Sequence, residues 1–306
     1  MNVLIFGLGS IGQKHIRVLL EIGGGGTNIY ALRSGLSDKI VPGVTNITSM
    51  EEAGVMFDFI IVANPTSTHY YTLEKLLGYQ IPVFIEKPLF HALQPGHTLV
   101  EEFVKRGIKT YIACNLRFHP CIIFLKNMLA SGDHRINEVN VYAGSYLPEW
   151  RPGVNFREVY SANAEMGGGV HLDLIHELDY IVWLLGKPLS AKATFTRKSS
   201  LNLNAVDYAN YLLEYEGYTV NVVLNYYRRK AKRTFEIVFE DKTIIADIQG
   251  QKVWDDDNLV FSANVDALYT YREQMKYFLS CLKDDSSLMN DIQSAFDVLK
   301  ICLNNE

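Results

Sequence analysis

The 306-residue sequence lacks the features that mark several special classes of protein. Its net charge is only -5, so it has no basic excess with which to bind nucleic acid or an anionic membrane. No apolar run approaches the roughly 18 residues that cross a bilayer. The chain starts on a strand pattern instead of a charged segment leading to an apolar leader. We therefore expect a soluble, cytoplasmic protein with neither nucleic acid nor membrane as a partner.

Cysteine is scarce as well. The four cysteines form no C-x-x-C pair and no metal-ligand spacing, which favours free thiols in a reducing compartment. The acidic triplet 255–257 has no further ligands in its pattern and predicts a solvated turn, so we expect no metal. With 48% hydrophobic and 21% charged residues, the composition is that of an ordinary globular protein. Its length suggests about two domains of on the order of 100–200 residues each.

The sequence does contain a glycine fingerprint at its start. An apolar run over residues 3–6 predicts a buried strand, and Gly7, Gly9 and Gly12 then form G-x-G-x-x-G before a helical pattern. In such a loop the first glycine permits the turn, the second lets a pyrophosphate approach the backbone, and the third allows close helix packing. We expect Gly7, Gly9, Ser10, Ile11 and Gly12 to bind a dinucleotide. The alternative is a strand–helix turn that binds no nucleotide.

Short apolar runs alternate with amphipathic patterns over residues 1–120, as in βαβ units. The pattern predicts a doubly wound parallel sheet, which binds ligands beyond the carboxyl ends of its strands. Gly7, Asn64 and Glu86 each follow a predicted strand and should meet at that edge. The predicted strands are 2–6, 28–32, 58–63, 82–85 and 109–113, with helices near 11–22, 66–78 and 94–106.

Residues 121–306 differ in composition and periodicity. Their segments are rich in Val, Thr, Tyr and Phe, and apolar and polar residues partly alternate with a period of two. We expect an α+β domain with a mostly antiparallel open sheet, giving an α/β protein with domains 1–120 and 121–306. The free face of that sheet suggests a homo-oligomer, a dimer or tetramer. The predicted strands are 137–147, 190–199, 206–215, 218–228, 234–241 and 243–248, with helices near 169–185, 266–283 and 288–303.

The end of the second strand bears on the choice of dinucleotide. An acidic residue there would select the 2′-hydroxyl of NAD, but this sequence has Arg33 and Ser34. A guanidinium can pair with a 2′-phosphate, which favours NADP over NAD. Two alternatives remain open: Arg33 is a solvated surface charge, or Asp38 takes the acid's role.

Five segments together resemble the glucose–fructose oxidoreductase / inositol dehydrogenase (Gfo/Idh/MocA) family. They are Gly7–Gly12, Asn64-Pro-Thr-Ser-Thr-His69, Glu86-Lys87-Pro88, Asn115-Leu-Arg-Phe-His-Pro120 and Gly167-Gly-Gly-Val-His-Leu-Asp173-Leu-Ile-His176. The resemblance implies a Rossmann domain, a second α/β domain, and a nicotinamide-dependent alcohol–ketone reaction on a sugar or cyclitol. Residues 149–153, 160–162 and 176–180 look like members from bacterial surface-sugar pathways.

The same resemblance places three residues in catalysis. Lys87 falls on the family's catalytic lysine, and its ammonium can polarise a carbonyl or donate to a hydroxyl. The Lys87–Pro88 bond can be cis, which would redirect the side chain. His176 falls on the proton-transfer histidine. Asp173 lies three residues before His176, whereas the family more often places this aspartate four residues before the histidine. Asp173 therefore orients the substrate, orients His176, or only places a negative charge at the N-terminus of a helix. The structural alternatives are a surface lysine and a core histidine.

Other residues are expected around the ligands. Pro65, Thr66 and His69 follow the third strand, where the family's loop contacts the cofactor, and His69 could equally pack a helix. Asn115 and Arg117 follow the fifth predicted strand and could bind the cofactor or the substrate. Arg117 could equally form an interdomain salt bridge instead. Arginine and aromatic side chains in the 150–160 loop suit a phosphate-bearing substrate, or merely anchor the loop. Besides the glycine-loop residues, Arg33, Ser34, Pro65, Thr66 and His69, the residues expected to bind the cofactor are Asn64, Glu86, Lys87, Asn115 and Arg117. The residues expected to bind the substrate are Lys87, Arg117, Trp150, Arg151, Arg157, Tyr160, Asp173 and His176.

The sequence thus predicts an NAD(P)-dependent oxidoreductase that moves a hydride between nicotinamide and a hydroxyl or keto carbon of a sugar, cyclitol or sugar nucleotide. The sequence-based mechanism expects Lys87 and His176 to be brought together from separate domains. Two alternatives stay open. One is a catalytically silent sensor that binds the dinucleotide, and the other is an NAD-assisted glycosidase or epimerase.

Overall fold

The computed structural model describes residues 1–33, 35, 40–132 and 135–304, and it divides into two compact units. Unit 1 comprises Met1–Asn115 and Asp266–Asp297, and unit 2 comprises Leu116–Val265 and Val298–Glu306. The sequence suggested two continuous segments, whereas residues 266–297 cluster with the first unit. Each unit is described by itself below.

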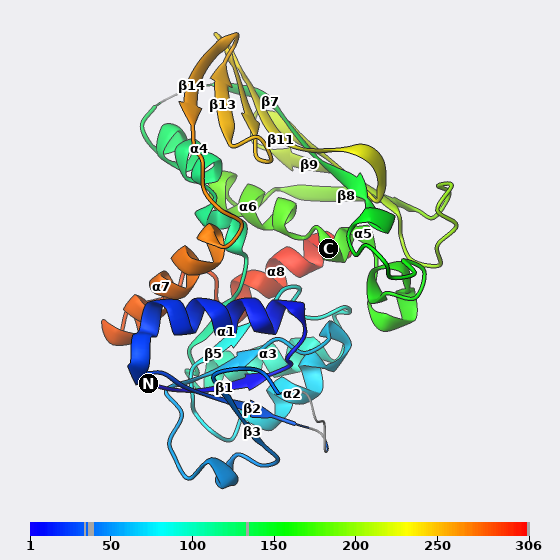
Figure 1. Cartoon of the computed structure of the whole chain (residues 1–306). Coiled ribbons are helices and arrows are strands. Elements are labelled where there is room, and N and C mark those ends of the chain that lie inside the picture. Colours follow the sequence, from blue (N-terminus) through cyan, green and yellow to red (C-terminus); the bar gives the residue numbers. More distant parts are fainter. Residues whose placement is uncertain (34, 36–39, 133–134, 305–306) are drawn as a thin grey trace. The chain divides into compact units, whose positions relative to one another are not determined.

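Unit 1 is built on a six-stranded sheet in which every neighbouring pair is parallel. Its order is β3-β2-β1-β4-β5-β6, so the chain winds outward from β1 on one side and from β4 on the other (Figure 1). The boundary between β1 and β4 is the switch point at which such sheets bind ligands. The strands are β1 (Asn2–Phe6), β2 (Asn28–Leu32), β3 (Val44–Ile47), β4 (Phe59–Val62), β5 (Val83–Ile85) and β6 (Thr110–Ile112).

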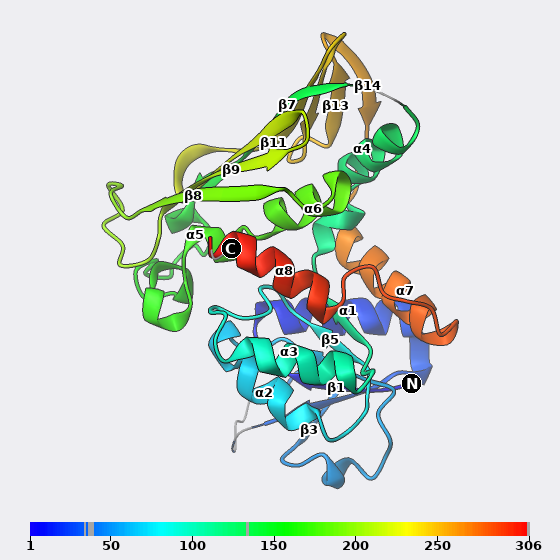
Figure 2. The same ribbon diagram turned by 180° about the vertical axis from the view of Figure 1, so that it is seen from behind.

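Helices cover both faces of this sheet. Figures 1 and 2 show α1 (Ser10–Gly23) and α7 (Tyr269–Lys283) on one face, and α2 (His69–Leu76) with α3 (Gly96–Lys105) on the other. The strands β1, β4 and β5 are buried on both sides, which explains their continuous apolar runs. Phe278 of α7 packs edge-on against Phe59 and Phe84, and this contact ties the late segment to the first core.

Unit 2 contains an eight-stranded sheet of order β14-β13-β12-β11-β7-β10-β9-β8. Only the β7–β10 pair is parallel, so the sheet is mostly antiparallel. The parallel Rossmann sheet and this second sheet confirm the predicted α/β fold class. The strands are β7 (Ile136–Tyr146), β8 (Ser190–Thr196), β9 (Tyr208–Tyr215), β10 (Tyr218–Asn225), β11 (Tyr227–Phe239), β12 (Thr243–Asp247), β13 (Lys252–Asp255) and β14 (Asn258–Ser262).

Helices lie on one face of the second sheet, as the views in Figures 1 and 2 agree. They are α4 (Pro120–Ala130), α5 (Val170–Asp173) and α6 (His176–Leu185), and the end of α8 (Ile292–Cys302) also belongs to unit 2. The opposite face carries hydrogen-bonded polar side chains, including Asn140 with Glu236 and Asn210 with Asn221. That face is therefore more polar than the strand pattern suggested.

Three strands and the helix α4 were not predicted, and one predicted helix is divided. β3, β13 and β14 were not predicted, because they are short strands in which most residues are exposed or only half-buried. The predicted helix 169–185 is two helices, since Leu174 interrupts it between α5 and α6. Asp256 and Asp257 form the predicted exposed turn. Within the described ranges no helix has both the length and the apolar character needed to cross a membrane.

Candidate active site

The glycine fingerprint forms the turn between β1 and α1, and its three glycines meet different surroundings. Gly7 has φ +96°, and a Cβ there would lie 2.4 Å from the Ala63 carbonyl oxygen. A Cβ on Gly12 would lie 2.2 Å from the Gly7 carbonyl oxygen, so the helix packs closely against the turn. Among the residues that the structure describes, none has an atom within 4 Å of the Cβ position of Gly9. The loop is therefore closed at its first and third glycines and open at the second.

The N-terminus of α1 suits an anionic group. Gly9 is the N-cap residue and supplies no side-chain hydrogen bond, and the first turn carries no acidic residue. Ser10 is exposed and Ile11 is half-buried. Unpaired N–H groups and the positive end of the helix dipole favour phosphate at such a terminus. These features fit the pyrophosphate of a dinucleotide.

The loop after β4 is held by side-chain and backbone hydrogen bonds. The Asn64 amide donates to Thr72 Oγ1 at 2.7 Å, and Asn64 Oδ1 is buried with no hydrogen-bond partner among the described residues. Pro65 and Thr66 start a short 3₁₀ turn that leads into α2. His69 is buried, with Nε2 at 3.1 Å from the Asn64 carbonyl oxygen and Nδ1 at 3.1 Å from that of Leu89. The ring of His69 thus links two loops at the carboxyl edge of the sheet.

Glu86 and Lys87 directly follow β5, the strand next to β4. Glu86 is buried, and its Oε1 lies 2.5 Å from Nε2 of His15, a fully buried residue of α1. His15 thus makes a polar contact in addition to packing edge-on against Phe84. Lys87 is half-buried, and the Lys87–Pro88 peptide bond is cis, as the sequence allowed.

Two further predicted cofactor residues of unit 1 lie at strand ends. Arg33 follows β2, is half-buried, and donates its backbone N–H to the Ile47 carbonyl oxygen. Ser34 and Asp38 lie outside the described residues. Asn115 follows β6 and is buried, and its amide donates to Thr270 Oγ1 of α7 at 2.6 Å. Of these residues, Arg33 lies where a group that reads the adenosine ribose is expected.

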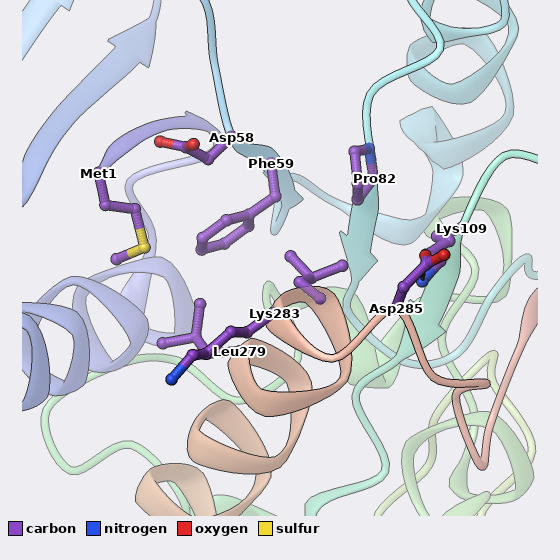
Figure 3. A pocket seen from close by; sticks show the side chains of 9 residues that line it. Met1, Asp58, Phe59, Pro82, Lys109, Leu279, Lys283 and Asp285 are labelled. Carbon is purple, nitrogen blue, oxygen red and sulfur yellow. Dashed lines mark ion pairs between the residues drawn. The ribbon is translucent and has the colours of Figure 1, made fainter.

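Unit 1 also has an open depression, but it lies at the other edge of the sheet. Figure 3 shows Met1, Asp58, Pro82 and Lys109, which precede β1, β4, β5 and β6, around it, together with residues of α7. An ion pair of 2.5 Å joins Lys109 and Asp285 at its rim. Parallel sheets bind their ligands at the carboxyl ends of the strands, so we assign the candidate site to the glycine-loop edge and not to this depression.

In unit 2, Asp173 accepts two tyrosine hydroxyls. Tyr160 donates to Oδ1 at 2.7 Å and Tyr226 donates to Oδ2 at 2.5 Å. Burial, and then the neighbouring Asp173 carboxylate, raise the pKa of both tyrosines, so both keep their protons at neutral pH. The sequence paired Asp173 with the substrate or with His176 and did not include Tyr226. Each oxygen of this buried side chain therefore has a hydrogen-bond donor, which fixes its orientation.

His176 is the first residue of α6 and is buried. Two ion pairs with buried acidic side chains hold this helix. Glu177 pairs with Arg233 of β11 at 2.6 Å, and Asp179 accepts a bidentate pair of hydrogen bonds from Arg117, each 2.8 Å long. Arg117 therefore forms a salt bridge, but its partner Asp179 lies in the same unit, so the bridge is not the interdomain one that the sequence left open. These pairs fix the helix turn from which His176 projects.

The loop before α5 contains the other predicted substrate residues. Trp150 donates to Ser145 Oγ at 2.8 Å and packs edge-on against Tyr226. The Arg151 guanidinium lies 5.8 Å from the Tyr160 ring centre. Arg157 donates to the Leu201 carbonyl oxygen at 3.2 Å, which is a loop-anchoring contact.

A glycine run lets this loop approach α5. A Cβ on Gly168 would lie 1.9 Å from the Tyr160 carbonyl oxygen, so only glycine lets the two backbones come this close. In the structure Gly168 permits the approach that brings Tyr160 to Asp173.

Several residues of these groups were missed from the sequence: His15 as a polar partner, Tyr226, Arg233, and the acids Glu177 and Asp179. A signal existed for the last two, because two carboxylates in the otherwise apolar helix 176–185 must be paired once the helix is buried. Tyr226 carries no such signal, since its partner lies 53 residues away.

The fold and the glycine-loop edge define a dinucleotide-binding Rossmann unit joined to an α+β unit. Residues 1–113 match the family model "Oxidoreductase family, NAD-binding Rossmann fold", and residues 123–245 match "GFO/IDH/MocA C-terminal domain". The chain therefore belongs to the GFO/IDH/MocA oxidoreductase family.

Individual relatives are distant. The chain is 25% identical over 189 residues to the rhizopine catabolism protein MocA of Rhizobium meliloti. The matched region covers 60% of this chain and 56% of that protein. The chain spans about half the length of such curated relatives.

Solved structures agree with the fold. Levoglucosan dehydrogenase in complex with NADH has a TM-score of 0.84 at 14% identity, covering 99% of this chain and 95% of the other. UDP-N-acetylglucosamine 3-dehydrogenase from Acidithiobacillus ferrooxidans has a TM-score of 0.77 at 18% identity, covering 100% and 96%. At these identities the likeness concerns the fold alone.

Proposed function

We propose that this protein is an NAD(P)-dependent dehydrogenase that interconverts a hydroxyl and a keto group on a sugar, cyclitol or sugar nucleotide. One observation carries the proposal. The glycine loop, Asn64 and the Glu86–Lys87 pair follow β1, β4 and β5, three adjacent strands beside the switch point of a parallel sheet. A lysine at the same edge of the sheet as the glycine loop and the N-terminus of α1 combines an acid–base group with a dinucleotide-binding loop.

The residues of unit 1 fit the dinucleotide. Gly9 and the N-terminus of α1 would bind the pyrophosphate, Arg33 would read the ribose or its 2′-phosphate, and Asn64 Oδ1 would accept a hydrogen bond. The nicotinamide, when bound, supplies or accepts the hydride. Arg33 in place of an acid favours NADP over NAD.

The protein's own task is to position the substrate and move a proton. Lys87 would donate to the substrate oxygen, and His176 would exchange a proton with it. Asp173 accepts hydrogen bonds from Tyr160 and Tyr226, so its proposed role is to hold these two hydroxyls near the substrate. Trp150, Arg151 and Arg157 remain proposed substrate contacts, and their cation and ring chemistry suits a phosphate-bearing sugar.

Fluorescence titration with NADH and NADPH, followed by absorbance at 340 nm with a panel of sugars, inositols and sugar nucleotides, tests the proposal. Saturable binding and a substrate-dependent absorbance change support a dehydrogenase. Saturable binding with no chemistry on any member would favour a sensor. Turnover of a glycoside or epimer without net change at 340 nm would favour the redox-assisted alternative.

We also propose that the open face of the unit 2 sheet contacts another copy of this chain. Light scattering coupled to size exclusion tests it, since a monomer at all concentrations would rule it out.

A further inference from the structure

We infer that two buried histidines, His15 and His69, clamp the segment Glu86–Leu89 and thereby position Lys87. His15 fixes the residue before Lys87, and His69 fixes the residue two places after it. Both are positioning residues, because each acts on Lys87 through a neighbouring residue. This inference rests on the proposed function and assigns it two further residues.

The first contact is the hydrogen bond between His15 and Glu86. His15 Nε2 lies 2.5 Å from Glu86 Oε1, and His15 is fully buried. Its Nδ1 has no hydrogen-bond partner within the described ranges, so a proton on Nε2, donated to the carboxylate, leaves no buried N–H unsatisfied. The rings of Phe84 and Tyr271 pack edge-on at 5.0 and 5.9 Å and hold the imidazole in place. The bond thus links the helix of the glycine loop to the end of β5.

The second contact is His69 between two loops. Its ring nitrogens lie 3.1 Å from the carbonyl oxygens of Leu89 and Asn64. Burial lowers the pKa of His69, so the ring is neutral at pH 7 and donates to one of these oxygens at a time. Glu86 is close enough to favour the charged form of His69, which places both histidines around the same segment. The loop after β4 and the loop after β5 are therefore joined through one ring.

The two contacts act on a short stretch. Between Glu86 and Leu89 there are only Lys87 and Pro88, so the backbone of Lys87 is bounded on both sides by hydrogen-bonded, buried residues. The precision of a catalytic group depends on such support, and a shift of about 1 Å can reduce a rate about 100-fold. Lysine has a long flexible side chain, so fixing its backbone is one way to position the ammonium group.

Matched variants separate positioning from general stability. We expect His15→Leu, which fills the space but removes the donor, to lower kcat about 10- to 100-fold while KM and the Kd of NADPH change little. His15→Gln retains an N–H near the Nε2 position and should recover part of kcat. For His69, which uses both ring nitrogens, neither Asn nor Gln should recover as much. His97→Gln is the control, since His97 faces Glu101 at 3.7 Å on the exposed surface of α3.

A double-mutant cycle with Lys87→Ala tests the route of action. If His15 acts through Lys87, then His15→Leu has almost no further effect on single-turnover rates in the Lys87→Ala background. Additive losses, or a wild-type kcat for folded His15→Leu and His69→Gln, would overturn the clamp. Melting curves and NADPH titration show whether each variant is folded.

The result is distinguishable from failure of the proposed function. If the wild type binds NADPH but turns over no substrate, the proposed function fails. If the wild type is active and Lys87→Ala is slow, while the histidine variants match the control, only the clamp fails.

Discussion

The two units of this protein secure their candidate residues in different ways. In unit 1 the candidate residues follow adjacent parallel strands, and backbone geometry shapes the glycine loop: a positive φ at Gly7, a close contact at Gly12 and open space at Gly9. In unit 2 side chains from distant parts of the sequence hold one another, as Asp173 does with Tyr226 and Glu177 with Arg233. A site shaped by backbone geometry can be predicted from a sequence motif. A site held by contacts between side chains far apart in the sequence cannot, because it depends on the whole fold.

The strongest way to break this contrast is to remove one proposed acid–base residue from each unit. We expect Lys87→Ala and His176→Ala each to reduce kcat by about 10²–10⁴ while dinucleotide still binds. Lys105→Ala, at an exposed helix end of unit 1, is the control. Steady-state kinetics with the substrate found in the panel give the measurement. Wild-type turnover in both variants would remove the proposed mechanism.

A second test concerns the stability of the fold at acidic pH, which depends on a buried histidine of unit 2. Burial lowers the pKa of His171 to about 4, below its unfolded value near 6.5. The unfolded chain then binds more protons, so His171 destabilises the fold as pH falls from 6.5 to 4, by at most about 3 kcal/mol. His171→Phe should flatten the pH dependence of the urea midpoint in that window. His119, whose pKa burial also lowers to about 4, keeps part of the slope. An unchanged slope in His171→Phe would contradict the prediction.

The same contrast explains what sequence could and could not predict. The strands of unit 1 were predictable because burial on both faces leaves continuous apolar runs, and the motif residues follow them directly. β3 was missed since Thr45 and Asn46 are exposed in the middle of it. The placement of α7 could not be predicted from the sequence, because the pattern of an amphipathic helix does not show which hydrophobic core the helix packs against. Phe278 packs on Phe59 and Phe84 more than 190 residues away in sequence.

Alanine at two glycines tests the backbone-built site of unit 1. Gly12→Ala places a methyl group 2.2 Å from a carbonyl oxygen and should cost about 1–3 kcal/mol of unfolding free energy. Gly9→Ala meets no atom and has φ -68°, so stability should stay the same while dinucleotide binding weakens. Urea unfolding and NADPH titration measure the two effects. Equal binding by Gly9→Ala and wild type would show that no phosphate approaches this residue.

Removing one hydroxyl tests the side-chain network of unit 2. Tyr226→Phe deletes a hydrogen bond to the buried Asp173 carboxylate, and such bonds to charged groups contribute about 1.5–3 kcal/mol. Tyr218→Phe is the matched control, because that ring stacks on Tyr215 and is half-exposed. Its effect should stay within about 0.5 kcal/mol. Urea unfolding of both variants decides the matter, and equal losses would mean that the Asp173 contact adds no stability.

The smallest expected effect concerns Arg33 and the choice between NADP and NAD. Replacing its guanidinium by a carboxylate in Arg33→Asp removes the group that would pair with a 2′-phosphate and supplies an acceptor for a 2′-hydroxyl. The ratio of the NADPH to the NADH dissociation constant should rise by about 10-fold, equivalent to about 1.4 kcal/mol. Arg17→Asp, on the exposed side of α1, controls for net charge. The charge argument also predicts a salt dependence, since an Arg–phosphate contact near the surface weakens as ionic strength increases. If the ratio is the same in wild type and Arg33→Asp, and NADPH binding by the wild type is insensitive to salt, then Arg33 is a solvated surface charge and the dinucleotide is chosen elsewhere.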